Sequence, residues 1–212
     1  DRGWENYDNG EYEKAFDDWK LALELENEMW GRSMLYRYMG YAKANLNDWA
    51  AEKKYYTRAI ETLPKHDYAY YWRGYGKFKN DGDYYGAISD FKNFMYYDYN
   101  NERDLFDETV YWIANATFQA GLHYDAMLKV TAIIDSWESE ENPSDYYIRN
   151  KAQWAWLYTF RGRSYNILEM KDLAEEDLEM AYELYNRFSL AKEGKSSFWF
   201  PYNLANFYYD NE

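Results

Sequence analysis

The chain has 212 residues and a net charge of −14, from 24 Lys and Arg against 38 Asp and Glu, with two histidines and no cysteine. The missing cysteines exclude disulfides and thiolate metal sites, and the negative charge disfavours nucleic acids and anionic membrane surfaces, which are bound mainly through Lys and Arg. Aromatic residues make up 23% of the chain, with only 3 prolines and 11 glycines, a composition typical of a folded protein with long helices.

The predicted helices follow a short motif that recurs along the chain. Gly10–Phe16, Gly82–Ile88 and Gly121–Met127 each place a glycine ahead of an aromatic residue and an alanine. Each motif predicts a turn and then a helix, because apolar residues continue behind the alanine at steps of four and three, which is one helix face. The faces behind the three motifs consist of Ala15, Trp19 and Ala22; Ala87, Phe91 and Phe94; and Ala126, Val130 and Ile133. A fourth face with the same spacing consists of Ala174, Leu178 and Ala181.

A second kind of helical segment precedes each of these helices and carries a small residue near its middle. Glycine inside a helix costs about 1 kcal/mol relative to alanine, so its recurrence at one position needs a packing reason. We therefore predict that a neighbouring helix approaches closely at these positions, which are Gly40, Gly74, Ala114, Gly162 and Ala205.

The paired segments resemble tetratricopeptide repeats, whose unit is two antiparallel helices with small residues at their contacts. The second unit carries the resemblance through Tyr36, Met39, Gly40, Tyr56, Ala59 and Pro64, and the fifth through Tyr158, Gly162, Tyr165, Ala174, Leu178 and Ala181. Glu52 departs from the pattern, since alanine is expected there. The resemblance implies an all-α fold, an α-solenoid of about five antiparallel helix pairs plus a C-terminal helix, wound as a right-handed superhelix.

We expect the whole chain, residues 1–212, to form one solenoid domain, because no low-complexity linker divides it. The predicted units lie near residues 1–29, 33–66, 67–101, 105–137 and 145–190, followed by a terminal helix near 198–210. The acidic segment Ser136–Ser144 is the longest predicted loop.

Catalytic and metal-binding patterns are missing from the sequence. His66 and His123 have no second histidine at metal-ligand spacing, and no glycine-rich phosphate loop is present. The acidic clusters are typical of a solvated surface. We therefore predict a protein that is not an enzyme, binds no metal and uses no cofactor. No segment is apolar enough to span a bilayer, so we expect no membrane insertion.

Aromatic residues recur on one face of the first helix of each pair, and the resemblance places this face along the concave groove. Tyr and Trp provide large contact areas with a polar group, as recognition surfaces need. The alternative is that they fill the core, as leucine does elsewhere. If Tyr71, Tyr111 and Trp156 contact a ligand, each is partly exposed. The predicted groove residues are Arg37, Tyr41, Tyr68, Tyr71, Tyr75, Tyr111, Asn115, Phe118, Trp156, Arg163, Asn166, Trp199, Tyr202 and Asn206, with Met34, Glu108, Thr159 and Tyr209 on the same faces.

Some tetratricopeptide proteins hold the C-terminal carboxylate of chaperones with a lysine, asparagine and arginine clamp. Arg37, Tyr41, Tyr71 and Tyr75 occupy the corresponding positions here, so the resemblance does not extend to that clamp. A tyrosine-rich groove favours a protein or peptide segment as the partner, and a carbohydrate is a weaker alternative.

Two functions fit these patterns. The first is a protein–protein interaction scaffold with an aromatic concave groove. The second is a structural subunit that assembles end to end into a filament, because the sequence starts and stops within helix pairs and open solenoid ends stack on one another. An extracytoplasmic or secreted location fits the lack of cysteine about as well as a cytoplasmic one.

Overall fold

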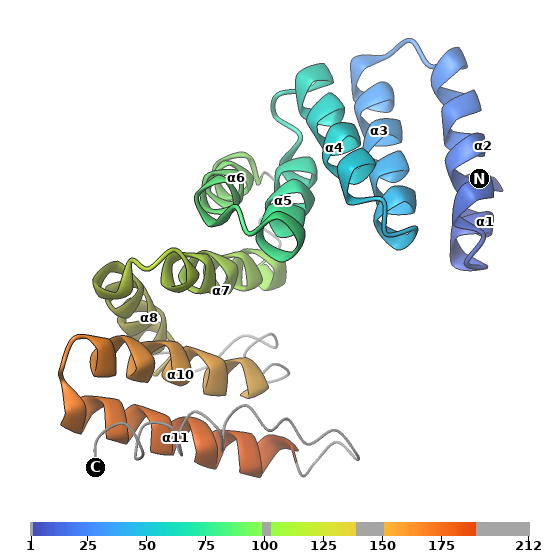
Figure 1. The fold of residues 1–212 in the computed structure, drawn as a ribbon. Helices are drawn as coiled ribbons and strands as arrows, with labels where there is room; N and C mark the ends of the chain where they lie inside the picture. Colours follow the sequence, from blue (N-terminus) through green and yellow to red (C-terminus); the bar gives the residue numbers. More distant parts are fainter. Residues whose placement is uncertain (1, 99–102, 139–150, 190–212) are drawn as a thin grey trace. The chain divides into compact units, whose positions relative to one another are not determined.

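The computed structural model describes residues 2–98, 103–138 and 151–189, and every regular element within these ranges is a helix (Figure 1). The all-α prediction is thus confirmed for the described part of the chain. The helices group into two compact units, Asp1–Asn101 and Glu102–Glu212. The arrangement of both units as one superhelical domain stays a prediction.

The described part of the first unit contains three successive helix pairs, coloured from blue to green in Figure 1. Each helix packs against the next one along the chain, which is the arrangement expected of a helical repeat. The helices are α1 (Arg2–Asp8), α2 (Tyr12–Leu25), α3 (Met29–Asn45), α4 (Trp49–Thr62), α5 (Asp67–Gly76), extended by the π-helical turn η1 (Lys77–Asp81), and α6 (Tyr84–Tyr97). The unit ranges near residues 1–29, 33–66 and 67–101 stay a prediction, and α3 begins at Met29, ahead of the start expected near residue 33.

The second unit contains two helix pairs, α7 (Arg103–Gln119) with α8 (His123–Glu138), and α10 (Lys151–Ile167) with α11 (Lys171–Ser189). Helix α10 also packs against α7 and α8, which joins the pairs around one core. The unit ranges near 105–137 and 145–190 stay a prediction. The terminal helix predicted near 198–210, with Ala205, lies outside the described residues.

The recurring turn motifs adopt the predicted conformation. Gly10, Gly82 and Gly121 have φ values of +76°, +65° and +78°, in the left-handed region that favours glycine. The helices that follow begin within three residues. For α6 the start is also capped, because the Asp83 carboxylate accepts a hydrogen bond from the Gly86 amide at 2.9 Å.

The small residues of the first helices mark close helix crossings, as predicted. A Cβ atom at Gly40 would lie 2.4 Å from the Tyr56 ring, and one at Gly162 would lie 3.0 Å from Leu178. At Gly74 the nearest atoms, on Asp90 and Phe91, would be 3.2 Å away. The contact at Gly40 is shorter than real Cβ atoms make, and those at Gly162 and Gly74 are tighter than most real Cβ contacts, so these glycines allow the paired helices to pack closely.

Buried ion pairs accompany two of the crossings and were not predicted. Arg73 donates two hydrogen bonds to Asp90, at 2.8 and 2.7 Å, and Arg161 donates two to Asp177, both at 2.7 Å. In each case the arginine directly precedes the crossing glycine. The exposed pair of Arg2 with Asp18 repeats the arrangement in α1 and α2. Burial raises the pKa of the Asp177 carboxyl, although Arg161 acts in the opposite direction.

Candidate functional site

A hollow of about 670 Å³ opens on the first unit, and we call it the Arg37 pocket. Helix α1 contributes Trp4, and α3 contributes Trp30, Met34, Arg37 and Tyr41. The rest of the lining comes from the α4–α5 connection and the start of α5, as Leu63, Lys65, His66, Asp67 and Tyr68. Its volume lies within the range of ligand-binding pockets, roughly 300 to 1,000 Å³.

The α3 side of the pocket follows directly from helical periodicity. Trp30, Met34, Arg37 and Tyr41 succeed one another at steps of four, three and four, which places them on one helix face. At 1.5 Å of rise per residue this face runs for about 16 Å. The pocket is therefore an elongated strip along three turns of α3.

Arg37 is held among aromatic rings. Its guanidinium carbon lies 5.1 Å from the ring centroids of Tyr38 and Tyr68 and 5.5 Å from that of Tyr41, within the distance at which a cation is attracted to a ring face. The Nε atom is buried without a hydrogen-bond partner. Arg37 forms no ion pair with any carboxylate of the described residues, so it presents an uncompensated positive charge in a protein of net charge −14.

His66 lies beside Arg37 with 4% of its surface exposed. Its Nδ1 atom is 2.5 Å from Ser33 Oγ, and the Ser33 hydroxyl donates to the carbonyl of Ala59 at 2.7 Å. Because that hydroxyl has one proton, the imidazole Nδ1–H donates to Ser33 and Nε2 is unprotonated. Burial and the nearby Arg37 lower the pKa of His66 to about 4. His66 is therefore neutral at pH 7 and ties the α4–α5 connection to α3.

Four residues predicted to face the groove meet in this pocket, namely Met34, Arg37, Tyr41 and Tyr68. Burial raises the pKa of the Tyr41 hydroxyl to about 12, so it stays protonated and polar. Tyr75 is half-buried on α5 and does not line the pocket.

Tyr71 belongs to the core of the first unit. It is 2% exposed, and its ring packs against those of Phe91 and Phe94 at centroid distances of 5.9 and 5.5 Å. The expectation that Tyr71 is partly exposed is therefore wrong. Position 71 faces α6 because α5 packs against α6 as well as α4.

The predicted residues of the second unit are also mainly core residues. Tyr111, Asn115 and Phe118 are buried, and the Phe118 ring stacks on Phe160 at 5.6 Å. The expected partial exposure is wrong for Tyr111 and holds for Trp156, which is half-buried. Arg163 is exposed, with its guanidinium 4.9 Å from the Phe118 ring, and Asn166 is half-buried. Trp199, Tyr202 and Asn206 lie outside the described residues.

Part of the pocket lining was not predicted from the sequence. Trp30, which is 64% exposed, continues the face of Met34 and Arg37 by one step, so periodicity provides a signal for it. For Trp4 and His66 the sequence gives no such signal, because only the packing of α1 and of the α4–α5 connection brings them to α3.

In the part of the chain that the structure describes, no cluster of three or more His, Asp and Glu side chains is arranged to hold a metal ion. Nor does any helix within those residues have the length and apolar character needed to cross a membrane.

The chain has the fold of tetratricopeptide-repeat proteins, as its similarity to solved structures shows. MamA superposes with a TM-score of 0.69 at 15% identity, covering 89% of this chain and 97% of MamA. YrrB, described as a TPR protein with an unusual peptide-binding site, gives 0.67 at 16% identity over 89% and 86%. A putative kinesin light chain of Podosopora anserina with TPR-like repeats gives 0.65 at 9% identity over 87% and 92%. No family model and no curated protein matches the sequence.

Proposed function

We propose that this protein is a non-catalytic interaction scaffold that binds a protein or peptide segment in the Arg37 pocket. The observation that carries the proposal is the pocket itself, an elongated hollow with aromatic walls and one uncompensated arginine. Rigid aromatic side chains and arginine are the residues that dominate binding energy at protein interfaces.

The serine and histidine next to the pocket support a structural role over a catalytic one. Ser33 is fully buried, and its hydroxyl proton is engaged by the Ala59 carbonyl. His66 donates to Ser33 instead of accepting its proton, so it does not activate a nucleophile. The similarity to YrrB adds support, since that protein is described as having a peptide-binding site.

The experiment that tests the proposal is a pull-down from the source organism with the wild-type chain and pocket variants. We expect Trp30→Ala and Tyr68→Ala to lose the captured partner while keeping the wild-type melting temperature, because both side chains are partly exposed. The control is Tyr96→Ala, which removes a tyrosine that is 80% exposed outside the pocket. Equal capture by all four proteins would refute the proposal.

End-to-end assembly is a second candidate, favoured by exposed apolar side chains on the first and last helix pairs described. In α2, Leu21 and Leu25 are 53% and 78% exposed. In α11, Leu173 and Met180 are also exposed. Sedimentation velocity at increasing concentration tests this candidate. A monomer at all concentrations would refute it, and Leu25→Glu is expected to dissociate any assembly that uses α2.

A further inference from the structure

Arg37 presents one edge of its guanidinium to the pocket. Its Nε atom is buried and without a partner, whereas Nη1 and Nη2 are not buried and make no hydrogen bond to any residue in the described ranges. The rings of Tyr38, Tyr41 and Tyr68 restrict the side chain from several directions. The two Nη groups therefore form a pre-oriented pair of donors, and such a pair matches the two oxygens of a carboxylate.

The charges around the pocket favour a single negative charge on the ligand. Lys65 adds a second positive charge at the lining, but Asp67 opposes it, and His66 is neutral at pH 7. The protein as a whole carries −14. Asp67 and the long-range field would thus repel a phosphate dianion or an acidic cluster more strongly than a single carboxylate.

The position of Arg37 along the pocket indicates where the carboxylate lies in the bound segment. Arg37 is seven residues beyond Trp30 and four before Tyr41 on α3, or about 10 Å and 6 Å along the helix axis. An extended peptide rises about 3.3 Å per residue, so the 16 Å strip accommodates about five residues, with at least one on each side of the carboxylate. This geometry suits an acidic side chain inside a segment, and a chain terminus at Arg37 would leave one end of the strip empty.

We propose that the Arg37 pocket binds an extended peptide segment through one internal Glu or Asp side chain, whose carboxylate pairs with the Nη edge of Arg37, while apolar side chains on either side pack on the aromatic walls. This inference rests on the proposed function and specifies its ligand. Arg37 is the specificity-determining residue, since the surrounding walls are mostly aromatic or aliphatic.

Calorimetry with short synthetic peptides tests the inference. The probe has five residues, acetylated and amidated ends, a central glutamate, alanine next to it and phenylalanine at both ends; a matched probe has glutamine at the centre. We expect the wild-type protein to bind the glutamate probe about tenfold or more tightly than the glutamine probe, as for one charge-assisted contact. In Arg37→Met the ratio of the two dissociation constants is expected to fall to about one.

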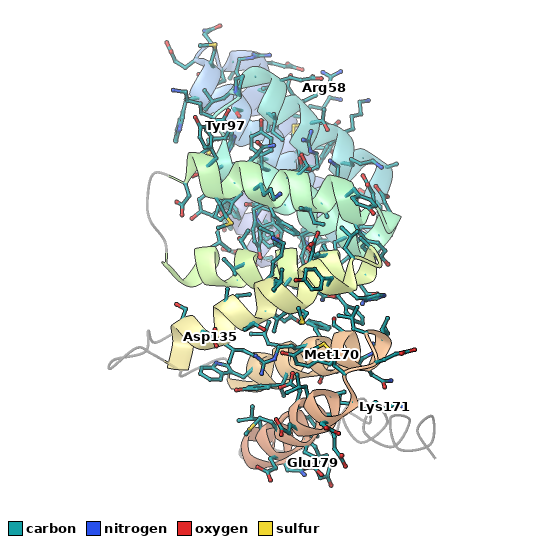
Figure 2. The ribbon with its side chains drawn as sticks, turned by 90° about the vertical axis from the view of Figure 1, so that its left-hand side faces the viewer. Arg58, Tyr97, Asp135, Met170, Lys171 and Glu179 are labelled. Carbon is teal, nitrogen blue, oxygen red and sulfur yellow. The ribbon has the colours of Figure 1, made fainter. Side chains whose placement is uncertain are left out.

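The matched control is Arg58→Met. Arg58, labelled in Figure 2, is exposed on α4, lies 6.0 Å from the Tyr36 ring centroid, and is outside the pocket. Its replacement changes the net charge by the same amount, so it should leave the ratio unchanged. Because the two probes are compared on the same variant, any loss of folded protein affects both measurements equally.

Other probes distinguish the alternatives. A glutamine probe with a free C-terminal carboxylate that binds as tightly as the capped glutamate probe would overturn the internal position, and tighter binding of a central phosphoserine would overturn the single negative charge. A wild-type ratio of one, or no binding of any probe, would overturn the inference. If the peptide inference is overturned, the proposed function still stands if capture of the partner in the pull-down depends on Tyr68. It fails if capture is unchanged in both Trp30→Ala and Tyr68→Ala.

Discussion

Replacing Gly40 with alanine tests whether the small residues are required by helix crossing. The new Cβ would lie 2.4 Å from Tyr56 Cε1 and within 2.9 Å of two further ring atoms. Carbon atoms pack best at about 3.5 to 4.0 Å, so the ring or the helix has to shift by about 1 Å. Tyr56 is 1% exposed, and its ring also packs against Tyr41 at 6.0 Å, which leaves little space for that shift.

Two opposing effects set the size of the change. Alanine gains about 1 kcal/mol over glycine in a helix interior, whereas overpacking a dense core costs about 1 to 3 kcal/mol. For the short contacts at Gly40 we expect the upper part of that range, and thus a net loss of about 1 to 2 kcal/mol in the free energy of unfolding. Gly74→Ala provides a comparison with a milder clash, because a Cβ atom there would lie 3.2 Å from its nearest neighbours. For this variant the gain in helix propensity and the cost of overpacking should nearly cancel.

Urea unfolding followed by far-ultraviolet circular dichroism measures both variants, which lie in the same compact unit. A double variant that also carries Tyr56→Leu should lose less stability than the sum of the two single changes, because the shorter side chain relieves the clash. If Gly40→Ala is as stable as the wild type or more stable than Gly74→Ala, the close-crossing explanation is refuted.

Three further predictions concern buried ionisable side chains. Asp177→Ala should lower the free energy of unfolding by about 3 kcal/mol in urea denaturation, because it leaves Arg161 mostly buried without its carboxylate. Burial, and to a lesser extent Asp81, raises the pKa of Glu52 from 4.5 to about 7. Because the folded state then favours the protonated carboxyl, the free energy of unfolding should fall by roughly 1 to 3 kcal/mol as pH rises from about 4.5 to above 7. Glu52→Gln should abolish that fall. Burial and Arg37 lower the pKa of His66 to about 4, so its ring proton resonances should show no titration by NMR between about pH 5.5 and 8. A titration midpoint of about pH 6.5 would contradict its buried, neutral state.

The helices and their crossings were predictable because they depend on local pattern. Steps of three and four residues, turn glycines and recurring small residues are all read along one segment of chain. Gly40 and Gly162 were identified in this way, and the structure confirms their close contacts with Tyr56 and Leu178.

The exposure of individual aromatic residues could not be predicted in this way. Tyr68 and Tyr71 are three positions apart on α5, which separates them by about 60° around the helix. That angle suffices for Tyr68 to line the pocket while Tyr71 packs against α6. Which of them faces solvent depends on the neighbouring helices. The position of the Arg37 guanidinium likewise depends on contacts with aromatic rings from two helices, α3 and α5.

The arginine–aspartate pairs at the helix crossings also determine how the repeats align. The partners are 16, 17 and 16 residues apart in α1–α2, α5–α6 and α10–α11. Sliding one helix past its partner by a single turn, about 5.4 Å, would separate each arginine from its aspartate and bring bulkier residues against the crossing glycine. At the α5–α6 and α10–α11 crossings, where the pairs are buried, a misaligned hairpin is thus penalised by an unpaired buried charge as well as by steric clash, which favours the native register of these two helix pairs.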